Sequence, residues 1–250
     1  SSQTVHSFSA PNYIGTGAYS KKFTDGFSFV ANPAVLSQTT LFSAGIYSEK
    51  KFLLKELNLY TIAVAIPSSL GGFGILARYS GISDYNETQL GLGYAKNLDQ
   101  VDVGIQFDYS AFRIAGYEST SVVQAHAGMI WHVMENLHTG IHRVNVLSGR
   151  LSGNTNEKPA FVFKMRVGYE VFDAVYISSE ICKEENKLVT VQTLLQYTVA
   201  GKFFLRGGIS TATSSPWLGA GWAWNNFRID ITSAYHPQLG ITPGLLLLFS

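Results

Sequence analysis

The feature that most constrains this chain is a period-two alternation of apolar and polar side chains that recurs along most of its length. In residues 101–109 (VDVGIQFDY), Val, Ile, Phe and Tyr occupy every second position, with Asp, Gly and Gln between them. Because side chains of an extended chain alternate between two faces, one face is apolar and the other is polar or glycine-containing. Residues 161–170 and 227–236 repeat the pattern. Segments of about ten residues with this alternation are typical of a β-barrel that has lipid outside and water inside.

The composition argues against several other classes of protein. Charged residues make up 14% of the chain, whereas soluble domains carry about a quarter. No apolar run approaches the ~20 residues of a membrane-spanning helix. A net charge of +1 without a basic patch gives no reason to expect a nucleic-acid partner. The single cysteine, Cys182, excludes an internal disulfide and a cysteine-rich zinc site.

The alternation predicts an all-β fold, a closed antiparallel transmembrane β-barrel of about fourteen strands. Residues 1–38 do not alternate and are predicted to form a short N-terminal plug or collar, with the barrel over residues 39–250. A soluble β-sandwich or propeller is the alternative architecture, because it also contains many short strands. The predicted strands are 39–48, 57–66, 72–80, 87–97, 101–110, 121–134, 138–147, 160–171, 175–182, 188–198, 202–210, 217–224, 226–236 and 240–249.

The predicted connections alternate in length, which a sandwich would not explain. Connections after even-numbered strands are short, as at 97–100, and those after odd-numbered strands tend to be longer, as at 148–159. Short periplasmic turns and longer outer loops are typical of bacterial outer-membrane barrels. This pattern places both ends of the barrel on the periplasmic side of the outer membrane. Because such a barrel must be exported, we expect that a signal peptide has been removed.

The N-terminal segment carries three phenylalanines, Phe23, Phe27 and Phe29, whose spacing predicts burial in or beneath the lumen; a disordered tail is the alternative. Asp25 is placed to cap a short helical turn over residues 26–31. The pair Asn32–Pro33 is expected to end that turn, since a residue that precedes proline is biased towards extended geometry.

The lumen-facing positions carry histidines and charges of both signs. His126, His132, His138 and His142 share this face, and the predicted strands bring His132 diagonally near His138 and His142. His126 lies about 20 Å along its strand from His132 and cannot join them. We therefore expect polar filling of the lumen and no metal site.

Arg166 and Arg228 belong to a set of lumen charges of mixed sign, which predicts an internally paired, filled lumen. No nucleophile, base and orienting group are placed together, so the sequence predicts no catalytic residues and no cofactor.

The predicted outer loops contain two apolar clusters. Phe52, Leu53 and Leu54 lie among lysines, and Phe112, Ile114 and Tyr117 occupy another prominent loop. Apolar groups beside charge at a membrane rim suit docking of a partner protein. They equally suit strand continuations in contact with lipid headgroups, including lipopolysaccharide.

Residues 15–38, GTGAYSKKFTDGFSFVANPAVLSQ, resemble the start of FadL-type barrels, and within them the PorV/PorQ branch. Gly17–Ala18–Tyr19, Asp25 and Asn32–Pro33–Ala34 carry the resemblance. It implies a fourteen-stranded barrel with its N-terminal segment inside or beneath the lumen. It also implies a non-enzymatic accessory subunit of a protein-export complex, such as type IX secretion, together with other outer-membrane proteins.

The alternative function is a FadL-like channel for a small hydrophobic ligand. An apolar cavity open sideways to the bilayer would favour the channel, whereas a filled lumen and co-purifying proteins would favour the subunit. The chain is shorter than typical members and has no long segment resembling the hatch of the fatty-acid transporters. Transport of long-chain fatty acids is therefore not expected.

Overall fold

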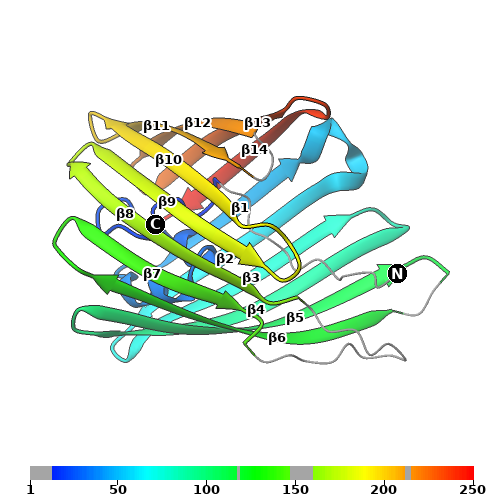
Figure 1. The fold of residues 1–250 in the computed structure, drawn as a ribbon, viewed down its shortest axis with the longest axis horizontal. Helices are drawn as coiled ribbons and strands as arrows, with labels where there is room; N and C mark the ends of the chain where they lie inside the picture. Colours follow the sequence, from blue (N-terminus) through cyan, green and yellow to red (C-terminus); the bar gives the residue numbers. More distant parts are fainter. Residues whose placement is uncertain (1–12, 117–118, 147–159, 212–214) are drawn as a thin grey trace.

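The computed structural model describes residues 13–116, 119–146, 160–211 and 215–250 of the chain, and it is all-β. Its strands form one closed antiparallel barrel (Figure 1), which confirms the predicted fold class. No helix in this part of the chain is long and apolar enough to cross a membrane. The strands are β1 (Ser43–Lys50), β2 (Asn58–Ser68), β3 (Gly71–Gly81), β4 (Tyr85–Leu98), β5 (Val101–Ile114), β6 (Thr120–His132), β7 (Leu137–Val144), β8 (Val162–Phe172), β9 (Val175–Glu184), β10 (Thr190–Val199), β11 (Phe203–Ser210), β12 (Ser215–Trp224), β13 (Phe227–His236) and β14 (Gly240–Phe249).

The barrel closes because β1 pairs with both β2 and β14. Gly45 lies opposite Ala63 on one side and opposite Leu248 on the other. Each strand therefore has two hydrogen-bonded neighbours, and the described strands form a closed ring.

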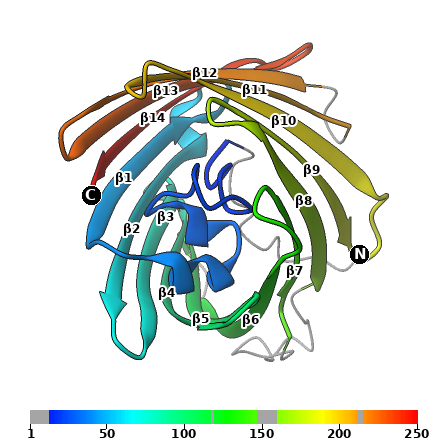
Figure 2. The same cartoon turned by 90° about the vertical axis from the view of Figure 1, so that its left-hand side faces the viewer.

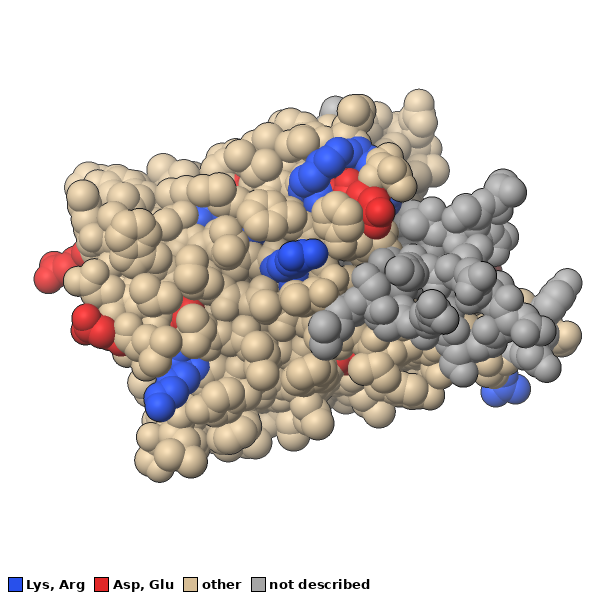
Figure 3. All heavy atoms as spheres, turned by 60° about the horizontal axis from the view of Figure 1, so that its bottom comes forward, with Lys and Arg blue, Asp and Glu red and all other residues tan. Residues whose placement is uncertain are grey.

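The two faces of each strand follow the alternation in the sequence. In β5, Ile105, Phe107 and Tyr109 point outwards and are each 49% exposed, whereas Asp102 and Asp108 point inwards and are buried. Across the barrel the outward positions are occupied mainly by Leu, Ile, Val and aromatic residues, and the face in Figure 3 is covered mostly by uncharged side chains. Such an apolar outer band is what a membrane barrel presents to lipid.

The N-terminal part of the barrel differs from the predicted strand boundaries. Residues 39–42 are not part of a strand, and β1 begins at Ser43. They follow two short 3-10 helices, η1 (Ser28–Val30) and η2 (Pro33–Gln38). Asn32 caps η2 by accepting a hydrogen bond from the Ala34 amide, and Pro33 occupies the first helical position. This capped start favours helical geometry up to Gln38 and delays the first strand.

The connections follow the predicted asymmetry, with two exceptions. The turns after β2, β4, β8 and β12 contain two residues each, at 69–70, 99–100, 173–174 and 225–226. At the opposite end the chain spans residues 51–57 between β1 and β2 and residues 145–161 between β7 and β8. The connections 82–84 and 237–239 at that end are also short, with three residues each. We call the end that carries the two-residue turns and both barrel termini the turn end.

Candidate functional site

The candidate site is the contact between the barrel lumen and residues 13–38, which we call the plug. Figure 2 shows this segment enclosed by the strands, with η2 nearest to β4 and β5. The structure buries Phe23, Phe27 and Phe29, together with Tyr19 and Leu36. These side chains and the inward apolar residues of the wall form the hydrophobic core of the molecule. The lumen is thus filled at this level by the chain itself.

Glycines on the inner wall make room for the plug backbone. A Cβ atom at Gly104 would lie 2.5 Å from the Ala34 nitrogen, and one at Gly72 would overlap the Leu36 carbonyl. A Cβ atom at Gly168 would overlap the Tyr19 carbonyl, and one at Gly128 the Asn32 side chain. Glycine was expected at lumen-facing positions, but its role in making room for the plug was not predicted. The signal was the recurrence of glycine at inward positions of successive strands.

Asn32 is the most connected polar residue of the plug. Its amide nitrogen donates to the Tyr19 hydroxyl at 2.7 Å and to the Ile141 carbonyl at 3.1 Å. Its oxygen accepts from the Ala34 amide at 3.0 Å. One buried side chain therefore joins both halves of the plug to the wall at β7.

Four titratable residues form a chain of polar contacts across β5 to β8. His132 Nε2 lies 2.7 Å from Asp102, and the Nδ1 atoms of His132 and His138 lie 2.9 Å apart. His138 Nε2 lies 3.4 Å from Glu170. The two ends of this chain hold two separate parts of the plug, Gln38 and Ser20. Asp102 accepts from Gln38 at 2.9 Å, and Glu170 accepts from the Ser20 hydroxyl at 2.6 Å.

The arrangement of the histidines differs in part from the prediction. The β6–β7 register places His132 directly opposite His138, but it places His142 opposite Gly128. His142 instead lies beside His126, with ring centroids 5.9 Å apart, so the expected contact of His132 with His142 was wrong. His126 also contacts Asp108 at 3.0 Å. Within the described residues, no three His, Cys, Asp or Glu side chains are grouped so that they could hold a metal ion.

The lumen arginines pair with carboxylates. Arg166 Nε donates to Glu180 at 3.0 Å and its Nη1 to the Gly15 carbonyl of the plug at 3.3 Å. Arg228 Nη1 lies 2.8 Å from Asp25 of the plug, and its Nη2 lies 2.6 Å from Asp230 of β13.

Arg206 and Arg228 also pack against one aromatic ring. Arg206 Nη1 lies 3.4 Å from Asp230. The guanidinium carbons of Arg206 and Arg228 lie 4.5 Å and 4.7 Å from the centroid of the Phe204 ring. Burial opposes ionisation of Asp25, but the charges of Arg228 and Arg206 and a hydrogen bond from Ser28 outweigh it, so the pKa of its carboxyl is lowered.

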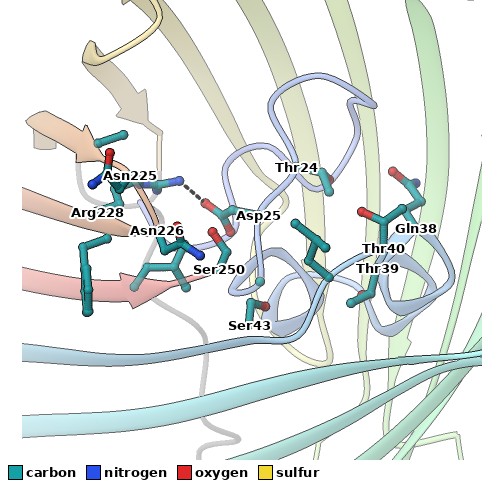
Figure 4. Close-up of a pocket in the computed structure, with 15 residues that line it drawn as sticks. Thr24, Asp25, Gln38, Thr39, Thr40, Ser43, Asn225, Asn226, Arg228 and Ser250 are labelled. Carbon is teal, nitrogen blue, oxygen red and sulfur yellow. Dashed lines mark ion pairs between the residues drawn. The ribbon is translucent and has the colours of Figure 1, made fainter.

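A cavity of about 260 Å³ lies beside this cluster at the turn end (Figure 4). Arg228 and Asp25, joined by their ion pair, face one another from the barrel and the plug. Gln38 at the end of the plug, the next residues 39–41 and residues 225–226 of the β12–β13 turn form much of the remaining lining. A second cavity, of about 30 Å³, lies deeper in the lumen among Arg78, Gln89 and Asp108.

The predicted outer-loop residues have different surroundings. Phe52 folds back onto the wall, since its backbone amide donates to the Thr242 hydroxyl at 3.1 Å. Leu53 and Leu54 in the same connection are exposed.

The second cluster was misplaced by the prediction. Phe112 and Ile114 are strand residues, because β5 continues in register with β4 as far as the pair Tyr85–Ile114. Their placement in a loop was therefore wrong, and the alternative, that they continue a strand, is confirmed for Phe112 and Ile114. Tyr117 lies outside the described residues.

These features define a closed fourteen-stranded barrel of the membrane type whose lumen holds its own N-terminal segment.

A scan against family models gave no match, and no curated protein matches the chain in sequence. Solved structures do match. The Pseudomonas putida toluene transporter TodX has a TM-score of 0.65 at 8% identity, with 98% of each chain covered. The CymD monoaromatic hydrocarbon channel has a TM-score of 0.63 at 11% identity, covering 98% of this chain and 94% of its own. A Pseudomonas aeruginosa FadL homologue has a TM-score of 0.61 at 9% identity, with 94% of each chain covered. The chain is thus similar in fold to FadL-type hydrocarbon channels over nearly its whole length.

Proposed function

We propose that the protein is an outer-membrane channel for a small apolar molecule and that the plug is its gate. The observation that carries this proposal is the agreement in fold with TodX and CymD over 98% of the chain. This extent means that the likeness is not confined to a few strands. It supports the channel more than the accessory subunit of an export complex.

Passage through this lumen requires the plug to move. Tyr19, Phe27 and Leu36 are fully buried inside the barrel, and Arg78, Gln89 and Asp108 form a hydrogen-bonded polar layer deeper in the lumen. The barrel wall closes through its own strand pairs without the plug. The plug can therefore move relative to the inner-wall glycines that it contacts, while the strand pairing of the wall stays intact.

A reversible disulfide between plug and wall tests the gate. The Asn32 Cγ atom lies 3.0 Å from the position of a Cβ at residue 128. In a disulfide, a sulfur lies about 3 Å from the Cβ of the partner cysteine. The pair Asn32→Cys and Gly128→Cys, in a Cys182→Ser background, should therefore cross-link.

We expect the oxidised pair to reduce the initial rate of labelled toluene uptake, in cells that lack other hydrocarbon channels, to the rate without the protein. Dithiothreitol should restore uptake, because the reduced plug is free and has lost its Asn32 amide. Each single cysteine variant serves as a control that cannot cross-link. Equal uptake with the oxidised and reduced pair would contradict a gating plug, and no uptake by any variant would contradict the channel.

A further inference from the structure

The cavity at the turn end lies against a cluster whose barrel residues carry an excess of positive charge. The wall contributes Arg206, Arg228 and Asp230, which sum to one positive charge. The plug contributes the balancing carboxylate of Asp25. Arg206 Nε has no hydrogen-bond acceptor within the described part of the chain, so Arg206 retains donor capacity beside Arg228. Since a buried charge is costly unless it is paired, the wall needs an anion at this point whenever the plug is absent.

We propose that this cavity binds a small carboxylate with a compact apolar body, and that the ligand carboxylate takes the place of Asp25 on Arg228. In this view Asp25 is an internal ligand of the Arg228 site. Such a site goes beyond the proposed transport of an apolar molecule and does not depend on it.

The cavity provides both parts of such a site. Arg228 supplies the guanidinium, which binds carboxylates through several hydrogen bonds. Leu248, Leu41 and Ala223 supply apolar lining, and the side chains at Thr39 and Asn226 supply polar groups. Figure 4 shows that Asp25 approaches Arg228 from the plug, opposite the wall.

The size of the cavity restricts the ligand. Its volume is about 260 Å³, whereas a dry cavity of about 150 Å³ is sufficient for benzene. A single ring that bears a carboxylate therefore fits within this volume. Benzoate is a suitable probe.

Exchange of one carboxylate for another would loosen the plug locally. Replacing Asp25 by a ligand carboxylate leaves the number of ion pairs on Arg228 unchanged. The stability of the barrel wall should therefore change little. The plug loses its contact between Asp25 and the barrel, next to η1, where Asp25 also accepts from Phe27 and Ser28. Ligand binding should therefore increase the motion of residues 24–31.

Calorimetric titration of the purified full-length protein with sodium benzoate tests the site, with benzamide as a neutral probe of the same shape. Asp25→Asn should bind benzoate at least about tenfold more tightly, because an internal competitor that holds the site more than nine-tenths of the time lowers apparent affinity by that factor. The double variant Asp25→Asn with Arg228→Gln should lose benzoate binding. It keeps Arg206 and Asp230 balanced and is therefore expected to fold.

Asp173→Asn is the matched control, because it removes another carboxylate that pairs with the plug at the same end, through Lys22, without lining the cavity. Its affinity for benzoate should equal that of the original protein. Benzoate, but not benzamide, should accelerate amide hydrogen exchange in residues 24–31. Equal affinity for the two probes, or an unchanged affinity in Asp25→Asn, would overturn the site. Since transport is not measured, either result would leave the channel proposal standing.

Discussion

Asn32 is the single residue whose loss should most weaken the attachment of the plug. Its amide is buried and joins the Tyr19 hydroxyl, the wall carbonyl of Ile141 and the Ala34 amide. Asn32→Ala leaves these groups without partners, and an unsatisfied buried polar group costs about 1–3 kcal/mol. We expect faster amide hydrogen exchange throughout residues 13–38, with little change in the strands.

The control for this change is Asn86→Ala, at the opposite end of β4 from the turn end. The Asn86 amide donates to the Ile82 carbonyl at 3.3 Å within a single hairpin. Its removal should leave exchange in the plug unaltered. If Asn32→Ala behaved in the same way, the plug would not depend on the Asn32 contacts.

Asp25 gives the attachment of the plug a defined pH dependence. Its pKa in the folded protein lies below the ordinary 3.8. A carboxylate with a lowered pKa stabilises the folded state fully above its ordinary pKa and loses that contribution as the pH falls through the folded value. The difference in plug exchange between the original protein and Asp25→Asn should therefore stay constant from about pH 7 to about pH 5.

That difference should shrink only in more acidic buffer, below pH 3.8. Comparison of the two proteins cancels the titration of the lumen histidines, which both contain. A difference that vanished between pH 7 and pH 5 would mean that Asp25 is not held as a paired carboxylate.

Residue-level features were predictable where a local pattern carried them. Asn32 was singled out because an Asn-Pro pair is recognisable in the chain itself, and Asn32 does adopt extended geometry before Pro33. The predicted cap at Asp25 was wrong, because η1 begins at Ser28 with Phe27 at its N-cap position and no side-chain cap. The pairing of Asp25 with Arg228, which joins residues far apart in sequence, depends on the barrel register and was not predicted. The same register decided which histidines meet, and it opposed the diagonal contact that alternation alone suggested.

At the scale of elements, the plug and the wall fit because η2 lies on glycines of the neighbouring strands. At Gly104 an added Cβ would lie 2.5 Å from both the Ala34 nitrogen and the Pro33 carbonyl carbon. Both are backbone atoms that no side-chain rotation can move. We expect Gly104→Ala to displace η2 and to raise the low single-channel conductance expected of the plugged barrel.

Gly207→Ala is the matched control in the wall. The nearest atom to its added Cβ is a flexible end of Leu218, at 3.1 Å, and no plug atom is within reach. Conductance should remain at the level of the original protein. If Gly104→Ala also left conductance unchanged, either the plug could shift without opening a path or the lumen would be blocked elsewhere.

The strands themselves were predictable because alternation with period two is set by the lipid outside and the filled lumen inside. The positions at which the strands begin and end were less predictable. β5 runs four residues past its predicted end, because cross-strand pairing with β4 continues beyond the clear alternation. The first strand was predicted to begin four residues too early, because η2 is stabilised by its cap and by packing inside the barrel.

At the scale of the whole molecule, the outer face must match the bilayer. Leu195 lies near the middle of β10, points outwards and is 49% exposed. Leu195→Arg should destabilise the barrel in a bilayer by about 2–4 kcal/mol. Gln192→Arg on the inner face of the same strand lies opposite Glu180 and should cost much less. Unfolding in lipid vesicles measures both, and equal costs would contradict the assignment of the faces.

The direction of the barrel in the membrane decides which side the gate faces. Both ends of the barrel and the exit of the plug, residues 39–42, lie at the turn end, together with the cavity beside Arg228. Short turns face the periplasm in outer-membrane barrels. A plug that is tethered there would be pulled or released from the periplasmic side, whereas the longer connections would meet the outside.

An epitope inserted at Lys55–Leu57, between β1 and β2, should therefore be bound by antibody on intact cells. The same epitope at 99–100, between β4 and β5, should be bound only after the outer membrane is permeabilised. Both insertions lie outside the strands, so neither should disturb the ladder. The reverse labelling would place the plug exit and the Arg228 cavity at the cell surface. The Arg228 cavity would then be the first site that an external carboxylate meets, and a candidate entry point for it.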